Sequence, residues 1–272
     1  MRLLPVSALI LILLGCGDPL TVRDAPAVDR SIRLFMVLDP DSATQALLLE
    51  SLDPGGKFED LRAELHASGG LIVVGQIHKY PDAPDVDDRR RCSQRYGAIG
   101  TNAASACVVF ESAVEPGRSY DLIVSARQRP TARARTTVPD AFSIVALSLA
   151  GEPPGTDGVD AHWNPSPSAH GYFALLRADS TDCVDVRGCP GGWSISTTDT
   201  VVSATIPREA LEDGSGPWTF EVIALDRGLY QYLNSGTGND LFSVPPIENV
   251  EGGHGVLGSW TRATRSAQQA PR

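Results

Sequence analysis

Short apolar stretches, each closed by Gly, Pro or Asp after about ten residues, recur along most of this 272-residue chain. Within them apolar and polar residues alternate, as Leu61, Ala63 and Leu65 do with Arg62 and Glu64. Such alternation places one face of a strand on a core and the other in water, whereas a helix needs apolar residues three and four positions apart. The pattern predicts an all-β protein built of sandwiches.

A hairpin is predicted around Ser68-Gly69-Gly70, between the alternating stretch and "LIVVGQI". A Gly pair suits a tight turn because glycine adopts left-handed backbone conformations without steric cost. Phe58, Leu61 and Leu65 would also fit one face of a helix. The β-branched residues that follow favour the strand.

Turn signals divide the chain into two series of strands. The second series starts directly after Pro139-Asp140 and reads "FSIVALSL", "VDAHWN", "HGYFALLRA", "VVSATIP" and "GPWTFEVIALD". Among these stretches only "PREALEDG" is a candidate for a helical turn. We therefore predict two tandem β-sandwich domains, over residues 31–139 and 140–262, and a C-terminal tail over residues 263–272.

The first residues, "MRLLPVSALILILLGCGD", indicate an exported protein. The apolar run from Leu3 to Leu14 reaches only about 18 Å as a helix, too short for the ~30 Å core of a membrane. It is typical of a signal peptide, here over residues 1–15. The run ends in Leu13-Leu14-Gly15-Cys16, which resembles the lipobox of bacterial lipoproteins. That resemblance implies that Cys16 carries a diacylglycerol; the alternative is an ordinary signal peptide and an ordinary thiol.

Residues 16–30 are polar and contain prolines, a composition typical of a tether between an anchor and a folded domain. The acyl chains of a lipoprotein supply enough buried methylene groups for firm membrane anchoring. Gly17 follows the cysteine, at the place where an Asp would retain a lipoprotein on the inner membrane. The expected location is the outer membrane, lipid-anchored, either periplasmic or exposed at the surface.

Four cysteines remain when Cys16 is set aside, and an oxidising compartment favours disulfides between them. Pairing in chain order closes two small loops, each contributing about 2–3 kcal/mol in the chain-entropy model. A zinc site is the rival interpretation, but the sequence has no C-x-x-C knuckle and no nearby pair of histidines. The predicted disulfides join Cys92 to Cys107 and Cys183 to Cys189.

The balance of charge argues against a nucleic-acid partner. The formal net charge is −10, and the only run of basic residues is Arg89 to Arg91. Binding to nucleic acid depends on a basic face that releases counterions from the phosphates. The expected partners are therefore an envelope protein or an extracellular ligand, together with the membrane that holds the N-terminal lipid.

Two parts of the chain resemble known sandwich modules. The second series of strands resembles a fibronectin type III module, with Trp163 on its second strand, Tyr172 on its third and a "V-x-A-x-D" ending that closes at Asp226. The corner tyrosine of that family falls at Trp218, which has no hydroxyl to bond the backbone. The stretch "EPGRSYDLIVSARQRPTARARTTVP" resembles the last strands of prealbumin-like or carboxypeptidase-regulatory sandwiches.

The lipobox, "PGRSYDLIVSA", "TTVP", the fibronectin-like half and "NVEGGHGVLGS" together resemble a family of uncharacterised Gram-negative lipoproteins that carry a domain of unknown function. Members of this family often accompany outer-membrane receptor systems. The resemblance implies a location and an architecture, and it brings no activity, cofactor or site residue.

Gly253, Gly255 and Gly258 have the G-x-G-x-x-G spacing of a dinucleotide-binding loop. Such a loop must follow a strand, open a helix and be answered by an acidic residue about twenty positions later. Only "SWTRATRSAQQAPR" follows Gly258, without an acid. We expect no cofactor here, and a tight turn that leads into a final strand whose missing side chains permit a close approach to its neighbour.

No motif with catalytic or metal-binding spacing stands out. The sequence has no G-x-S-x-G, S-x-x-K or H-E-x-x-H, although distant residues can still converge into a triad. The acidic loop before Cys92 lacks the order of a calcium site, so a solvated loop is favoured over a calcium ligand set. The histidines are scattered and are interpreted as surface or strand residues: His66, His78, His162, His170 and His254.

Aromatic residues offer one possible binding surface. Tyr230 and Tyr232, in "DRGLYQYLNSG", are the best candidates for an exposed platform that takes a glycan or a peptide. The sequence thus predicts a non-enzymatic binding or accessory module of the cell envelope. A hydrolase of extracellular glycan or peptide and a structural spacer of the envelope are the alternatives.

Overall fold

The computed structural model describes residues 30–53, 57–79, 105–150, 158–178, 193–198, 202–207, 218–235 and 248–267. These residues form strands and one described helix, α3 (Arg227–Ser235), so the predicted all-β class is confirmed. In the N-terminal half the strands are β1 (Ile32–Leu38), β2 (Gln45–Ser51), β3 (Arg62–Ala67), β4 (Ile72–Val74), β5 (Gln76–Lys79), β6 (Ser105–Phe110), β7 (Ser119–Ser125) and β8 (Ala132–Thr137). In the C-terminal half they are β9 (Ile144–Ala150), β10 (Gly158–Trp163), β11 (Gly171–Ala178), β12 (Trp193–Thr198), β13 (Ser203–Pro207), β14 (Trp218–Leu225), β15 (Val250–Glu251) and β16 (His254–Ala267).

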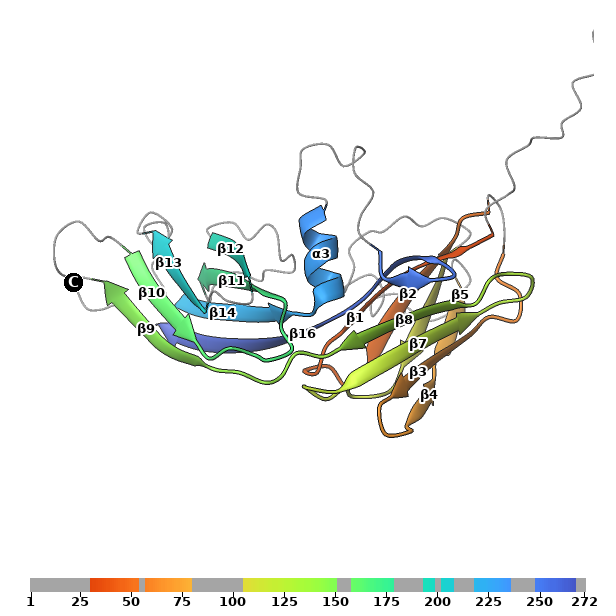
Figure 1. Cartoon of the computed structure of the whole chain (residues 1–272), viewed down its shortest axis with the longest axis horizontal. Coiled ribbons are helices and arrows are strands. Elements are labelled where there is room, and N and C mark those ends of the chain that lie inside the picture. The colour runs from red at the N-terminus through yellow and green to blue at the C-terminus, as the bar shows by residue number, and fades with distance from the viewer. Residues whose placement is uncertain are drawn as a thin grey trace, which may run out of the picture.

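The strands make three sheets, of which one runs through both halves of the molecule (Figure 1). This eight-stranded sheet has the order β12-β11-β14-β16-β1-β2-β6-β5. A five-stranded sheet, β15-β8-β7-β3-β4, packs against its N-terminal half, and a three-stranded sheet, β13-β10-β9, packs against its C-terminal half. The result is two sandwich halves side by side on a shared sheet, which we call the first and the second sandwich.

The core of the first sandwich lies between the eight-stranded and the five-stranded sheets. Alternate side chains of β3 and β7 point into it, as the sequence pattern predicts, and their neighbours face outward. The turn between β3 and β4 has left-handed backbone at Gly69 (φ 103°) and Gly70 (φ 94°), which confirms the predicted hairpin.

The core of the second sandwich is built around an aromatic cluster. The ring of Trp163 meets Tyr172 edge-on at 5.5 Å between centroids and lies 6.5 Å from Phe220. All three side chains are fully buried. Val138 belongs to the first core and Ile144 to the second, so the chain passes from one sandwich to the other between these residues.

Strand β16 holds the two sandwiches together. Its first part, His254 to Ser259, pairs in parallel with β1, and its second part, Trp260 to Ala267, pairs in antiparallel fashion with β14. The predicted end of the second domain at residue 262 therefore falls inside a strand. Residues 263–267, predicted as the beginning of a tail, are strand as well. Sequence spacing missed this because β16 changes its partner halfway along, without a turn.

Each sandwich has a tyrosine whose hydroxyl fastens the loop in front of its own strand. Tyr120 accepts a hydrogen bond from the backbone N–H of Glu115, and Tyr172 accepts one from the N–H of Ser166, both at 2.8 Å. Both strands follow a crossing from one sheet to the other. The corner that sequence comparison placed at Trp218 is thus supplied by Tyr172, three strands earlier in the second sandwich.

Candidate functional site

The junction between the sandwiches is the part of the molecule where side chains from distant segments converge. Helix α3 lies here, on the face of the eight-stranded sheet opposite the cores (Figure 1). Leu229 of the helix packs with Val37 of β1 and with Ile223 and Leu225 of β14. The helix therefore covers the line along which the two halves of the sheet meet.

Asp226 explains why the helix begins where it does. The residue follows β14, and its carboxylate accepts hydrogen bonds from the backbone N–H groups of Gly228 and Leu229, both at 3.1 Å. A carboxylate in this position caps the unpaired N–H groups of the first helical turn and complements the positive end of the helix dipole. The acid that closes the "V-x-A-x-D" ending is thus an N-cap.

The same carboxylate joins three other segments at this point. It accepts hydrogen bonds from the N–H of Ser259 on β16 at 2.9 Å and from the hydroxyl of Thr136 on β8 at 2.8 Å. The hydroxyls of Thr136 and Ser259 are in turn 2.9 Å apart. Burial raises the pKa of Asp226 above its ordinary value, although the four hydrogen bonds favour the charged form. With these donors around it, Asp226 acts as a structural cross-link.

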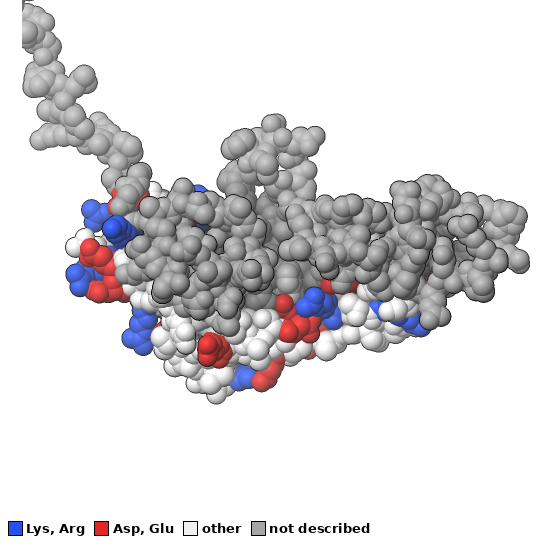
Figure 2. Space-filling view, turned by 180° about the vertical axis from the view of Figure 1, so that it is seen from behind, with Lys and Arg blue, Asp and Glu red and all other residues white. Residues whose placement is uncertain are grey.

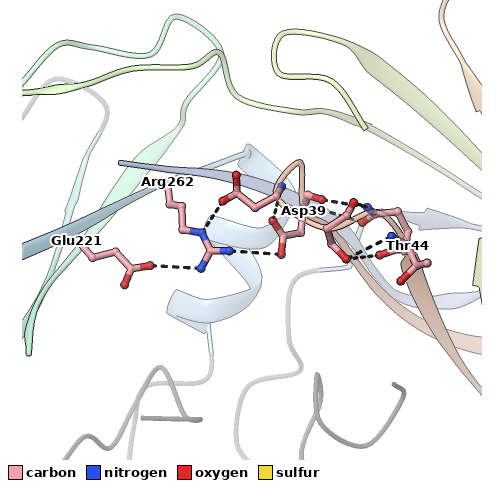
Figure 3. Close-up of polar contacts among 7 residues, drawn as sticks. Asp39, Thr44, Glu221 and Arg262 are labelled. Carbon is pink, nitrogen blue, oxygen red and sulfur yellow. Dashed lines mark hydrogen bonds and ion pairs between the residues drawn. The ribbon is translucent and has the colours of Figure 1, made fainter. Parts of the chain in front are cut away.

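Arg262 forms a second polar cluster on the next part of β16 (Figure 3). Its guanidinium donates to Asp41 at 2.5 Å and lies 4.0 Å from Asp39 and 3.9 Å from Glu221. Burial opposes the charge on Arg262, but the hydrogen bond to Asp41 and the three carboxylates together raise the pKa of Arg262. The cluster connects the turn after β1 to β14 and β16 across the junction.

Gln45 holds that turn in shape. Its side-chain oxygen accepts from the N–H of Asp39 at 2.9 Å, and its amide nitrogen donates to the carbonyls of Asp39 and Ser42. Gln45 is fully buried, so these hydrogen bonds are shielded from water. Ser42 and Thr44 add a further pair of bonds, between the Ser42 hydroxyl and the backbone of Thr44 (Figure 3). The carboxylates facing Arg262 are therefore presented by a fixed loop.

Tyr230 and Tyr232, the predicted platform, lie on α3. Tyr230 meets His170 edge-on at 5.3 Å, beside the start of β11, whereas Tyr232 lies 5.5 Å from Phe35 of β1. Residues two positions apart on a helix point about 200° away from each other. Both tyrosines are half-buried on opposite flanks of the helix, so they do not form one joint surface. That either ring contacts a ligand stays a prediction.

The glycines of the G-x-G-x-x-G motif permit close packing between neighbouring segments. Gly255 has φ 104°, and a Cβ atom there would lie 1.8 Å from the carbonyl oxygen of Leu34. A Cβ atom at Gly253 would lie 2.7 Å from the oxygen of Ile32, and one at Gly258 would lie 2.6 Å from Leu229. The motif opens a strand and not a helix. Its glycines let β16 lie close to β1 and let α3 lie close to β16.

The cysteine predictions fall largely outside the described residues. Cys16, Cys92, Cys183 and Cys189 all lie there, and Cys107 is buried on β6. Lipidation and both disulfides therefore stay predictions. Within the described ranges no helix has the length and apolar character needed to cross a membrane.

Histidine and carboxylate side chains meet in two places away from the junction. His66 lies 2.8 Å from Glu64 and lowers the pKa of that carboxyl, and His254 lies 2.9 Å from Glu248. The buried hydroxyls of Thr136 and Ser259 lie elsewhere, at the junction, where they form a cluster with Asp226. In the part of the chain that the structure describes, no group of three or more His, Cys, Asp or Glu residues could hold a metal ion.

The junction was not predicted from the sequence, although part of it has a recognisable sequence signal. Asp226 stands in front of Leu229, Tyr230 and Leu233, which have the three-and-four spacing of an amphipathic helix with an N-cap. This stretch is short and directly follows a stretch with a clear strand pattern, so the helix was not predicted. Arg262 had no signal, because its partners lie at the other end of the chain.

No protein-family model matches this sequence, and no curated protein matches it either.

Proposed function

We propose that this chain is a lipid-anchored exported protein that works as a binding or accessory module of the cell envelope, beside an outer-membrane receptor or an extracellular ligand. The lipid on Cys16, the disulfides Cys92–Cys107 and Cys183–Cys189, and the outer-membrane location are part of the proposal and rest on the sequence. The observation that best supports it is the single continuous sheet, in which β1 runs toward the second sandwich.

The direction of β1 supports a role in presentation. Arg33 pairs with His254 and Leu38 with Ser259, so β1 and β16 run the same way. Beyond Ser259, β16 continues into the second sandwich as far as Ala267. The start of β1 therefore lies at the end of the first sandwich remote from the second, and the proposed tether precedes it. A module held this way carries its second sandwich outward from its anchor.

The junction supports the same role because it fixes the second sandwich relative to the first. One strand, β16, belongs to both sandwiches, and it spans about 45 Å at ~3.3 Å per residue. Asp226 and Arg262 add cross-links on either side of the point where β16 changes partner. Fixed orientation lowers the entropy lost when such a module binds a partner.

The described surface suits a soluble module with mixed charge. On the face seen in Figure 2, basic and acidic residues of the described part are interspersed with neutral ones. On α3, Arg227 and Asn234 are exposed two turns apart and project away from the sheet. These positions are the natural places to look for a contact.

In-cell photo-crosslinking tests the proposal. A photoreactive residue at Arg227 on α3, or at the exposed His162 on β10, should capture an envelope protein. The same residue at Arg33 on β1, whose side chain is 54% exposed close to the tether, is the matched control and should capture less. Capture at none of these positions, together with turnover of a glycan or peptide by the purified protein, would replace the proposal with a hydrolase.

Metabolic labelling tests the anchor separately. Palmitate should label the parent chain and leave a Cys16→Ala variant unlabelled. Equal labelling of the two chains would remove the lipid from the proposal, whatever the crosslinking shows.

A further inference from the structure

Strand β4 and the residue before it carry three of the four large apolar side chains that are exposed among the described residues. Leu71 is 52% exposed, and Ile72 and Val74 are each 55% exposed. The other large apolar side chain of the described residues with comparable exposure is Val145 on β9, at 52%. Two of these side chains lie on one short strand and the third directly precedes it, an unusual grouping for a surface that faces only water.

β4 is also the last strand of its sheet, so no strand of the described residues pairs with one side of its backbone (Figure 1). The hydrogen bonds from Ala67 N to the Leu71 oxygen and from Gly75 N to the Ala63 oxygen are directed toward β3. In an antiparallel ladder alternate residues bond to the same neighbour, so Val73 faces β3 in the same way. The N–H and C=O groups of Ile72 and Val74 therefore point to the open side.

The two outward-pointing residues also share a side-chain face. Val73 packs against the core of the first sandwich, which leaves Ile72 and Val74 on the outer surface. The neighbouring strand β3 carries Arg62, Glu64 and His66 on that same surface. Sheet edges in soluble proteins are commonly protected by charged residues or proline. β4 has neither, although charged residues are present one strand away.

We propose that β4 pairs in antiparallel fashion with β4 of a second copy of this chain, about a two-fold axis at Val73. In that register Ile72 lies opposite Val74 of the second copy, and Val74 lies opposite its Ile72. Both residues of each pair present one free N–H and one free C=O, so four hydrogen bonds close without any group left over. The edge is complementary to itself, which is the property that favours a second copy over an unrelated peptide.

The same register places the apolar side chains together. Directly opposite residues of an antiparallel pair lie on one face of the sheet, so the Ile72 and Val74 side chains of both copies form one continuous row. The two five-stranded sheets then become one ten-stranded sheet across the axis. Because β4 is only three residues long, the contact is small and the association weak, with a dissociation constant on the order of 0.1 mM.

Sedimentation equilibrium of the full chain between about 10 μM and 1 mM tests the proposal. The parent chain should pass from monomer to dimer over this range. Ile72→Lys/Val74→Lys places like charges opposite each other in both pairs and should weaken dimerisation at least tenfold. Val145→Lys, an equally exposed apolar residue on another strand, is the matched control and should leave the dimer unchanged.

A charge-swapped variant tests the register. Ile72→Lys/Val74→Glu places Lys opposite Glu twice and should dimerise more strongly than the double-lysine variant. A register centred on residue 72 or 74 would instead place like charges opposite each other. A parent chain that stays monomeric at 1 mM, or a double-lysine variant that dimerises like the parent, would overturn the proposal.

Amide hydrogen exchange gives a readout that folding defects do not mimic. The amides of Ile72 and Val74 should exchange more slowly as the concentration rises, whereas the amide of Val73, already directed toward β3, should not change. Equal behaviour of all three amides would also overturn the proposed pairing.

Discussion

At the scale of single residues, Gly255 has the least freedom to change. Gly255→Ala places a methyl group where the carbonyl oxygen of Leu34 lies 1.8 Å away, at φ 104°. Neither β1 nor β16 can move without disturbing the ladder between them. We expect a loss of about 3 kcal/mol or more from overpacking and backbone strain. Denaturant unfolding followed by circular dichroism measures it.

Gly70→Ala is the control, because it has nearly the same backbone conformation, φ 94°, and nothing within 4 Å of the added Cβ. It should cost only about 1–2 kcal/mol, the strain of a left-handed conformation. Equal losses for the two variants would mean that the close approach of β16 to β1 contributes nothing.

Asp226 gives the expected pH dependence. Burial raises its folded-state pKa above the unfolded value of about 3.9. Its contribution to stability is therefore complete below pH ~3.9 and is lost as the pH rises through the higher folded pKa. The unfolding free energy of the parent minus that of Asp226→Asn should decrease over this window, because all other titrating groups are common to both.

The measurement is denaturant unfolding of both chains at several pH values from about 3.5 to 7, a range that brackets ordinary and raised carboxyl pKa values. Asn removes the titrating group, but its NH₂ group would face N–H donors and leave some of them without an acceptor. If the difference instead grows with pH, the four hydrogen bonds outweigh burial and the pKa of Asp226 is lowered.

At the scale of elements, the two tyrosine corners make a matched pair. Tyr172→Phe leaves the buried N–H of Ser166 without its acceptor, and Tyr120→Phe does the same to the half-buried N–H of Glu115. An unsatisfied buried donor costs about 1–3 kcal/mol, and less when water reaches it. We expect a loss of about 2 kcal/mol for Tyr172→Phe and about 1 kcal/mol for Tyr120→Phe. Thermal unfolding should reproduce the order, and the reverse order would contradict the burial argument.

Strands were the easiest elements to predict, because each needs only local alternation and a turn signal. The stretches around Leu65, Leu122 and Val222 contain their strands and bury the expected faces. Which strands pair is a different matter. β1 lies beside β16 because of packing at Gly255 that no local pattern carries.

The candidate site shows the same limit. Its parts on α3 have a helical signature in the sequence, starting at Asp226. The partners of Arg262 have none, since Asp41 is 221 residues away along the chain. A charged residue within a strand is predicted to face solvent unless the opposite charges that surround it are known.

At the scale of the whole molecule, the shared strand predicts how the chain behaves when it is cut. Ala141 is an exposed residue between the two cores. A protease site introduced there would cut the chain between β8 and β9, where it passes from the first sandwich to the second. The fragments should still co-elute in size-exclusion chromatography, because β16 pairs with β1 along six positions and Asp226 binds Thr136. Denaturant should separate them.

The same cut in a chain that ends at residue 247 provides the control, since it lacks β15 and β16. Its fragments should separate under native conditions. Native separation of the longer, nicked protein would instead mean that the sandwiches are independent and merely adjacent.

The pairing of the first described strand with the last governs how this protein can be made. When a ribosome has completed β2 to β8, the neighbour that β1 requires has not been synthesised. The half that is translated first is therefore completed only once β16 has been made, after a loop closure that spans most of the chain, and such distant contacts slow folding. Until then one side of β1 stays open and prone to aggregation. The first sandwich can be completed only after β16 has emerged, and that order of events is compatible with the export of an unfolded chain that the proposed function requires.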